Sequence, residues 1–486
     1  MSDIPSRLPS WPRRRAGALL AAASMLVIAG CAAIPDLGKR PQLATPSQFA
    51  VDRSFAAPAA DWPTDRWWDA YGDPQLSALI DEALKNSPTL AQAEARLRSA
   101  QAQAEQARAA TLPSLAANAQ VTETEQSRES GFPPFIQELL PRGYQSNGRV
   151  TLDASYDLDL FGRNRAALAA AVSDAAAAEA DAAQARLTLS TAVAQAYGDL
   201  ARLDAERDAA AQTVENRLQT SQLVAERVKN GLDTQGELKQ ALANDPASKA
   251  DVEALDEQIL ITRHLIAALL GEGPDRGLQI TAPTLNGVKP LGLPANLAAD
   301  LIGRRPDIVA ARLRAQAEAK RIDAAKAAFY PDVNLVGYIG QQSLPLTALA
   351  NPAAAIGSIG PAISLPIFEG GRLQGAYRGA RADYDASVDA YDQTLTQALQ
   401  DVADSAASVQ SAALQLDERR QALAAGEAAY NVARLRYQGG LSPYVSVLTA
   451  EDAVIAERRA AADAQARAFT LDIALVRALG GGFGGA

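Results

Sequence analysis

The chain carries few of the side chains that catalytic and metal sites need. Its 486 residues include one histidine, His264, and one cysteine, Cys31. Thiolate and imidazole metal sites take several such ligands, and a histidine-based catalytic triad would depend on His264 alone. No Walker lysine motif, G-x-S-x-G or HExxH occurs in the sequence. We therefore expect neither an enzyme nor a cofactor, and the net charge of −10 argues against nucleic acid as a partner.

Three aspartates, Asp153, Asp157 and Asp159, lie close enough in the sequence to be considered as metal ligands. The segment from Asp157 to Gly162 resembles the opening of a calcium-binding loop, but its twelfth position is Leu168, where a glutamate is required. The acids instead alternate with apolar residues at the even positions from 150 to 160. This alternation predicts a strand with one apolar face and one acidic face, whose acids would line a hydrated, cation-tolerant wall.

Three further segments alternate in the same way, so we expect four strands, over residues 114–126, 145–160, 332–342 and 355–367. Strands of about ten residues with one apolar and one polar face match an outer-membrane barrel better than a soluble sandwich. Four strands are too few to close a barrel, because about eight is the practical minimum. If these strands lie in a membrane, several chains must share one barrel.

Long helices separate the expected strands. No proline occurs between Pro141 and Pro246 or between Pro366 and Pro443, and both stretches are rich in alanine. A helix over Arg163 to Lys229 would be roughly 100 Å long, and such helices normally pack in bundles. Pro246, after Asn244 and Asp245, predicts a kink or break in a returning helix. The fold class expected is mainly α with a membrane β-barrel.

The N-terminus predicts a lipoprotein signal peptide over residues 1–30. Arg13 to Arg15 precede an apolar run from Ala16 to Ala29 that is too short to span a membrane. The run ends in Ile28-Ala29-Gly30-Cys31, which resembles a bacterial lipobox. We expect Cys31 to carry a covalent lipid, and residues 31–62 to form a lipid-anchored linker. Ala32 in the next position favours the outer membrane.

The chain contains an internal duplication. Pro88 and Pro113 lie as far apart as Pro306 and Pro331, and the segment 227–232 (RVKNGL) corresponds to 436–441 (RYQGGL). Each unit reads helix, strand, strand, long helix, turn, helix. We place the first repeat at 63–285 and the second at 286–482, with a short tail at 483–486.

Several motifs follow one another in a fixed order: Trp67-Trp68, Asp73-Pro74, 156–163 (YDLDLFGR), 304–307 (RRPD), Tyr330-Pro331, 366–372 (PIFEGGR), 437–441 (YQGGL) and 478–482 (ALGGG). On these motifs the chain from about Trp67 to Gly482 resembles the TolC-like outer-membrane factor family, in its NodT-type lipoprotein branch. Within them, Pro306 and Asp307 are typical of a helix start and do not require an anion site.

The resemblance implies a homotrimer with a twelve-stranded outer-membrane β-barrel and a long α-helical periplasmic barrel. It implies partners as well: a periplasmic adaptor (membrane fusion) protein and an inner-membrane pump, together a tripartite efflux system of the RND type that exports small molecules. The chain would be a passive, lipid-anchored conduit in the bacterial outer membrane, in contact with its lipid and extending into the periplasm. Two alternatives stay open: the outer-membrane channel of a type I protein secretion system, and a structural periplasmic lipoprotein without a pore.

The repeat also predicts the two turns at the periplasmic tip, where glycine permits a tight, positive-φ geometry. By the resemblance, Gly231, Leu232, Gly440 and Leu441 would contact the adaptor. Charged and polar neighbours would close the tunnel by bridging adjacent hairpins; these are Arg227, Asp233, Glu237, Arg436 and Tyr437. Ser446 and Thr449 stand where some relatives have aspartates, so we expect no tip cation site.

Overall fold

A computed structural model describes residues 33–51, 53–55, 59–125, 127, 133–139, 142–283, 293–294 and 297–484. The chain divides into two compact units, and each takes residues from both sequence repeats. The first, which we call the strand unit, comprises Ser99–Ala175, Leu313–Val388 and the described residues up to Gln42. The second, the helix unit, comprises Leu43–Arg98, Ala176–Arg312 and Asp389–Ala486.

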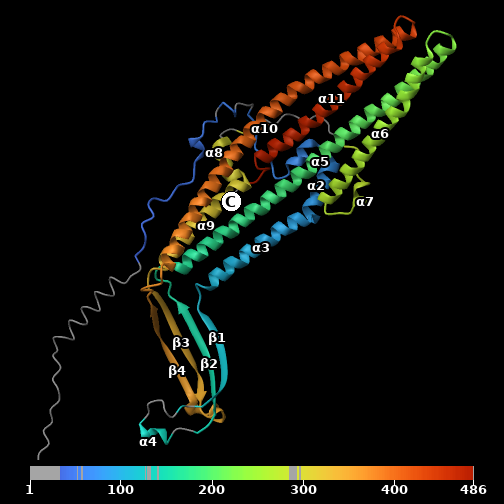
Figure 1. The fold of residues 1–486 in the computed structure, drawn as a ribbon. Coiled ribbons are helices and arrows are strands. Elements are labelled where there is room, and N and C mark those ends of the chain that lie inside the picture. The colour runs from blue at the N-terminus through green and yellow to red at the C-terminus, as the bar shows by residue number, and fades with distance from the viewer. Residues whose placement is uncertain are drawn as a thin grey trace, which may run out of the picture. The chain divides into compact units, whose positions relative to one another are not determined.

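The strand unit contains one antiparallel sheet of four strands, which lie side by side in chain order (Figure 1). The strands are β1 (Ser114–Thr124), β2 (Gln145–Asp157), β3 (Asp332–Ser343) and β4 (Ala355–Ser364). All four begin at the first residue of the predicted segments. Strands β2 and β4 end three residues early, because a turn with Asp159 at a φ of 46° follows β2 and Pro366 follows β4.

The sheet has one apolar and one polar face. Its register places Ala117 opposite Leu152, Leu152 opposite Ile339, and Gly337 opposite Ile359. The apolar residues of all four strands therefore share a face, and large members such as Leu152 and Ile359 are exposed. This arrangement confirms the predicted amphipathic strands.

Helices make up most of the rest of the chain. The longer ones are α2 (Pro74–Asn86), α3 (Pro88–Ala109), α5 (Arg163–Lys229), α6 (Gln235–Leu269), α8 (Leu297–Arg304), α9 (Pro306–Ala327), α10 (Arg372–Gln438) and α11 (Tyr444–Ala478). Short helices are α4 (Pro134–Gln137), α7 (Pro274–Gly277) and the 3₁₀ turns at Pro46–Gln48, Trp67–Tyr71, Leu346–Ala348 and Pro352–Ala354. Within the described residues, no helix has the length and apolar composition needed to cross a bilayer.

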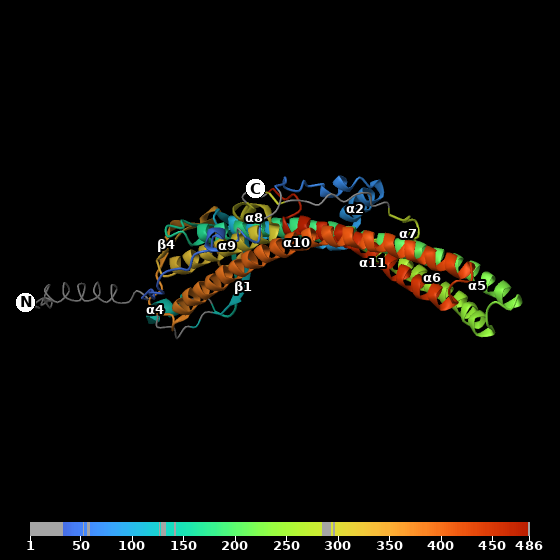
Figure 2. The ribbon, with the colours of Figure 1, turned by 90° about the horizontal axis from the view of Figure 1, so that it is seen from above.

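The duplication is visible in the helix lengths. Helices α3 and α9 have 22 residues each, α5 and α10 have 67 each, and α6 and α11 have 35 each. In Figures 1 and 2, α5 lies beside α6 and α10 beside α11 within the helix unit, each pair joined by a tight turn. Of the kink or break predicted at Pro246, the break is wrong, because α6 continues through this residue. Pro246 lies on an exposed part of the helix, and α6 accommodates both its missing N–H and its ring.

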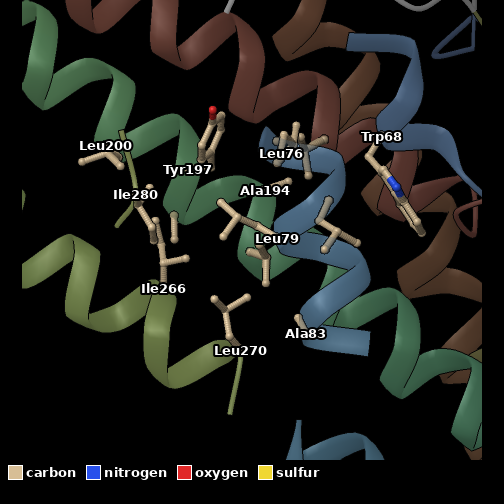
Figure 3. Close-up of a cluster of buried hydrophobic side chains, with 14 of the residues drawn as sticks. Trp68, Leu76, Leu79, Ala83, Ala194, Tyr197, Leu200, Ile266, Leu270 and Ile280 are labelled. Carbon is tan, nitrogen blue, oxygen red and sulfur yellow. The ribbon is translucent and has the colours of Figure 1, made fainter. Parts of the chain in front are cut away.

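The motifs near the N-terminus build the main core of the helix unit. Trp67, Trp68 and the apolar face of α2 pack against α5, α6 and α11, in the cluster drawn in Figure 3. Asp73 caps α2 by accepting bonds from the next helical N–H groups. The same carboxylate accepts a 2.7 Å hydrogen bond from the hydroxyl of Tyr197 on α5. The cap thus joins the start of α2 to a long helix.

Candidate functional site

The turns that join α5 to α6 and α10 to α11 have the same backbone geometry. Gly231 has a φ of 70°, and the N–H of Leu232 donates to the carbonyl oxygen of Arg227 over 2.8 Å. Gly440 has a φ of 69°, and the N–H of Leu441 donates to the carbonyl five residues earlier, also over 2.8 Å. Both are Schellman turns, in which a left-handed glycine ends the helix. The predicted role of glycine in these turns is confirmed.

Each turn presents an apolar side chain to the surroundings. Leu232 is 64 % exposed and Leu441 is 72 % exposed. A leucine at the end of a turn usually packs back on its helix, and these two leave most of their surface free. They are therefore available to a partner, although adaptor binding stays a prediction.

Behind the turns, Arg227, Asp233 and Tyr437 form one bonded cluster. The guanidinium of Arg227 donates to both carboxylate oxygens of Asp233, with Nε–Oδ2 at 2.9 Å and Nη2–Oδ1 at 3.2 Å. The hydroxyl of Tyr437 donates to the same carboxylate. The guanidinium carbon of Arg227 also lies 4.6 Å from the centroid of the Tyr437 ring, a cation–π distance. The cluster joins the first helix pair to the second within one chain.

The bonds to Asp233 determine its charge state. Burial alone would raise the pKa of this carboxyl, but the hydrogen bonds from Arg227 and Tyr437 outweigh it, so the pKa lies below its ordinary value. Burial, with the bond to Asp233, raises the pKa of the Tyr437 hydroxyl. At neutral pH the cluster therefore holds one carboxylate, one guanidinium and one neutral phenol.

Tyr437 is fixed by the small core that lies behind the turns. Its side chain is fully buried among apolar residues of α5, α6 and α11, and its ring centroid lies 5.7 Å from that of Tyr444. Further along α11, the buried Glu451 accepts a 3.2 Å bond from Arg217. Burial raises the pKa of Glu451, and burial also raises that of Tyr444, to about 12.

Two of the predicted closing residues have other contacts. Glu237 and Thr234 form a capping box at the start of α6, in which the Glu237 carboxylate accepts the backbone N–H of Thr234 over 2.7 Å. Arg436 is exposed, and its carbonyl is used in the second turn. Of the five predicted residues, the structure brings together Arg227, Asp233 and Tyr437.

The surroundings of the second turn offer little to a cation. The hydroxyl of Thr449 donates to the carbonyl of Val445 over 3.0 Å, as is common inside helices. Among the described residues, no group of three or more histidine, cysteine, aspartate or glutamate residues could hold a metal ion.

The predicted strand acids divide between two places. Asp153 lies on the polar face of the sheet, where its carboxylate accepts bonds from Asn118 (2.8 Å) and Thr151 (2.7 Å). On the same face, the Arg149 guanidinium lies 5.1 Å from the centroid of the Tyr338 ring. This contact crosses from β2 to β3, and no local sequence signal indicates it.

Asp157 and Asp159 belong to the junction between β2 and α5. Asp157 accepts bonds from Asn164 (2.7 Å) and Arg163 (3.1 Å). Asp159 is buried, and its carboxylate accepts the N–H groups of Asn164 (3.0 Å) and Arg165 (2.9 Å) in the first turn of α5. Its place is therefore that of a helix cap beyond the strand, and not a position on the polar face.

Sequence reasoning missed the role of Arg305. Pro306 and Asp307 begin α9, as predicted, but the guanidinium of Arg305 is itself buried. It donates to Asp307, to Asp401 of α10 and to the carbonyl of Ala478. The residue thus fixes α9 to two helices of the helix unit. Cys31, the predicted lipidation site, lies outside the described residues.

Comparisons with known proteins agree with this architecture. The family model described as "Outer membrane efflux protein" matches residues 79–272 and 297–481. The chain is 30 % identical over 464 residues to the multidrug resistance outer membrane protein MdtP of Escherichia coli, covering 95 % of each chain. It is 38 % identical over 371 residues to the fusaric acid resistance protein FusA of Burkholderia cepacia, covering 75 % of this chain and 69 % of FusA.

Solved structures show the same fold. The outer membrane protein VceC of Vibrio cholerae superposes with a TM-score of 0.82 at 41 % identity, covering 87 % of this chain and all of VceC. The outer-membrane channel OprN superposes with a TM-score of 0.82 at 28 % identity, covering 93 % of this chain and 99 % of OprN. The chain therefore belongs to the outer membrane efflux protein family, whose members are passive channels of the outer membrane and not enzymes.

Proposed function

We propose that this chain forms a homotrimeric channel that receives small molecules from a periplasmic adaptor and an inner-membrane pump of the RND type. The observation that carries the proposal is the four-stranded sheet, which has an exposed apolar face and two outer strands, β1 and β4. An open edge in lipid would leave backbone N–H and C=O groups unpaired, at several kcal/mol each. Three copies would supply twelve strands, which are enough to close a barrel.

The polar face of the sheet would then line the lumen. Arg149, Thr151 and Asp153 lie on this face. The Thr151 hydroxyl donates to the Asp153 carboxylate, and the Arg149 guanidinium lies over the Tyr338 ring. A wall whose charged groups are bonded to neutral polar or aromatic neighbours would stay hydrated without presenting a strong site for one solute. We infer that Asp153 contributes to a cation-tolerant wall and that the pump and adaptor select the cargo.

The helix turns are our proposed docking and closing region. Gly231, Leu232, Gly440 and Leu441 would contact the adaptor, since both turns are exposed and have the same shape. The cluster of Arg227, Asp233 and Tyr437 would hold the two helix pairs of one chain together when the tunnel is closed. The two leucines are exposed at the turns, whereas the polar cluster is buried behind them. This separation supports two roles, in which the leucines would bind the adaptor and the cluster would close the tunnel.

A covalent lipid on Cys31 would anchor the chain in the outer membrane. The residues that follow are held on the strand unit: Arg40 pairs with Asp323 at 3.0 Å, and Tyr384 donates to the carbonyl of Pro41 over 2.9 Å. Pro41 lies ten positions after Cys31, and this stretch spans at most about 36 Å when extended. Asp323 lies near the end of α9, shortly before β3 begins. A lipid on Cys31 would lie within this distance of Pro41, which supports anchoring of the chain beside the proposed barrel.

The direct test is reconstitution of the purified full-length protein in planar lipid bilayers, together with native mass spectrometry in detergent. We expect a trimer, and discrete conductance steps once the tunnel is open. In cells, deletion of the gene should sensitise the bacterium to small toxic compounds, and the wild-type gene should restore resistance. A detergent-stable monomer that gives no conductance would contradict the proposal. Loss of protein export with unchanged compound resistance would favour the secretion alternative.

A further inference from the structure

Arg149 is the only basic residue in the four strands. Strands β1, β3 and β4 contain neither lysine nor arginine, and β2 contains no other. The polar face of the sheet otherwise carries mostly neutral side chains, together with three acids, Asp153, Asp157 and Asp332. A positive charge on such a face attracts the solutes that the acids repel. Its effect depends on how far the acids neutralise it.

Two of the acids are engaged at the other end of β2. Asp157 and Asp332 both form ion pairs with Arg163 at the start of α5, at 3.1 Å and 3.3 Å. Asp157 lies eight residues along β2 from Arg149, about 26 Å in an extended strand. Salt largely screens exposed charges over such a distance. These two acids therefore do not neutralise Arg149.

The third acid is bonded to neutral neighbours. The Asp153 carboxylate accepts hydrogen bonds from Asn118 at 2.8 Å and from Thr151 at 2.7 Å. It shares the polar face with Arg149, but the two side chains form no ion pair. Among the described residues, the Arg149 guanidinium has neither an ion pair nor a hydrogen bond. Its N–H groups are therefore available to a solute.

Tyr338 fixes the guanidinium without neutralising it. The Arg149 Cζ atom lies 5.1 Å from the centroid of the Tyr338 ring, and a cation–π contact leaves the positive charge intact. In the register, Arg149 lies opposite Gln342, and Tyr338 lies opposite Asp153. The position between Gln342 and Tyr338 on the same face of β3 is Gly340, which has no side chain. The glycine thus leaves room for the Arg149 side chain to reach the ring.

We propose that Arg149, positioned by Tyr338, forms an anion site in the lumen that takes small organic anions such as carboxylates. The inference rests on the proposed channel, in which the polar face lines the lumen. A symmetric trimer would place three guanidinium groups at one level, and rings of arginine favour anions in pores. The planar guanidinium can donate two parallel hydrogen bonds to one carboxylate. Arg149 would thus add a preference for anions at one level of a lumen that elsewhere tolerates cations.

Charged thiol reagents can measure the electrostatic potential beside Arg149. Gln342 lies opposite Arg149 and is exposed, so Gln342→Cys places a thiol at the site. The full-length protein is reconstituted in lipid vesicles and treated with a negatively charged sulfonatoethyl or a positively charged trimethylammonioethyl methanethiosulfonate. The ratio of the two rate constants, negative over positive, should fall several-fold when Arg149→Gln is added, because the lost charge attracts one reagent and repels the other.

A second cysteine on the same face provides the control. Ser155 is also exposed and lies six residues from Arg149, about 20 Å along an extended strand. This distance is more than twice the screening length of about 8 Å at physiological salt. The ratio at Ser155→Cys should therefore stay unchanged when Arg149→Gln is added. Cys31 is the only natural cysteine, so protein without an engineered thiol measures the background.

Substitutions of Tyr338 test whether the ring positions the charge. Tyr338→Phe keeps the aromatic face and should keep the ratio at Gln342→Cys. Tyr338→Leu removes that face, so the guanidinium is no longer held in place, and the ratio should fall, although less than with Arg149→Gln. Equal ratios for the two variants would show that the ring does not position Arg149.

Ion selectivity of the open channel gives a readout that does not depend on labelling. In a potassium chloride gradient, Arg149→Gln should shift the reversal potential towards cation selectivity. Adding Gln342→Arg returns the charge to the same level on the opposite strand, and should restore the wild-type value. This exchange separates loss of the charge from a defect in folding.

The outcomes distinguish the anion site from the channel itself. A trimer that conducts, but gives the same ratio at Gln342→Cys with and without Arg149, would overturn the anion site alone. Monomers in native mass spectrometry that give no conductance in bilayers would refute the channel on which the site rests.

Discussion

The hydroxyl of Tyr437 donates a hydrogen bond to the carboxylate of Asp233, 204 positions away in the sequence. Tyr437 lies in the last turn of α10, and Asp233 lies in the turn that follows α5. One carboxylate therefore holds the ends of both helix pairs, and Arg227 fixes that carboxylate from its own helix. Loss of the bond from Tyr437 should loosen the pairs relative to each other without disturbing the turns themselves.

Tyr437→Phe with Glu237→Ala should increase the opening frequency of the purified channel and leave trimer assembly intact. The structure assigns this effect to Tyr437, because Glu237 is engaged in the capping box of α6. Single-channel recording on the double variant is the measurement. The single variant Glu237→Ala serves as control and should open like the wild type. Equal opening frequency in all three proteins would show that the cluster does not close the tunnel.

If the cluster of Arg227, Asp233 and Tyr437 closes the tunnel, closure should be insensitive to pH over a wide range. The folded pKa of Asp233 is lowered, so its contribution is complete above the ordinary aspartate value of about 3.9 and is lost only as the pH falls through the lower folded value. The folded pKa of Tyr437 is raised, so its contribution is complete below the ordinary tyrosine value of about 10. Opening frequency should stay constant between about pH 5 and pH 9. A change in opening frequency with its midpoint near neutral pH would contradict this assignment.

Leu152→Arg should impair membrane assembly far more than Asp153→Arg. Leu152 lies on the apolar face, where an arginine near the bilayer midplane costs about 2–4 kcal/mol. Asp153→Arg places the charge on the polar face, and loses the bonds from Asn118 and Thr151. The yield of assembled oligomer in outer-membrane fractions gives the comparison, with Asp153→Asn as control. Similar yields for both arginine variants would show that the face assignment is wrong.

Cys31→Ser should abolish lipidation while the barrel still folds. The prediction rests on the apolar run that ends in Ala29-Gly30-Cys31. Mass spectrometry of the mature N-terminus should find a diacylglyceryl or triacyl group on the wild type and none on the variant. A processed wild-type protein with an unmodified Cys31 would refute the anchor.

The sequence was sufficient to predict features that depend on short repeating patterns. The period of two indicated all four strands, and the predicted segments begin where the strands begin. Long proline-free stretches predicted α5 and α10. Glycines at equal positions of the two repeats located both turns. These features follow from backbone geometry that neighbouring residues impose.

Contacts between distant segments were not predictable in this way. Arg227, Asp233 and Tyr437 were all named from the sequence, but nothing local indicates that one carboxylate accepts from both of the others. Asp159 shares the spacing of Asp153, yet a positive φ turns its carboxylate to the first turn of α5. Pro246 carries the usual signal of a helix break, yet α6 continues through it.

α5 and α10 have equal lengths, and so do α6 and α11. This equality constrains which insertions and deletions the chain can tolerate. One residue added to α5 alone would rotate everything beyond it by about 100° and advance it by 1.5 Å. The turn at Gly231 would then no longer stand level with that at Gly440, and Asp233 would move out of reach of Tyr437. Changes in length are therefore tolerable only when α5, α6, α10 and α11 change together, in steps of about seven residues, or two helical turns. The depth of the tunnel can therefore change only in discrete steps, which four segments far apart in the sequence set jointly.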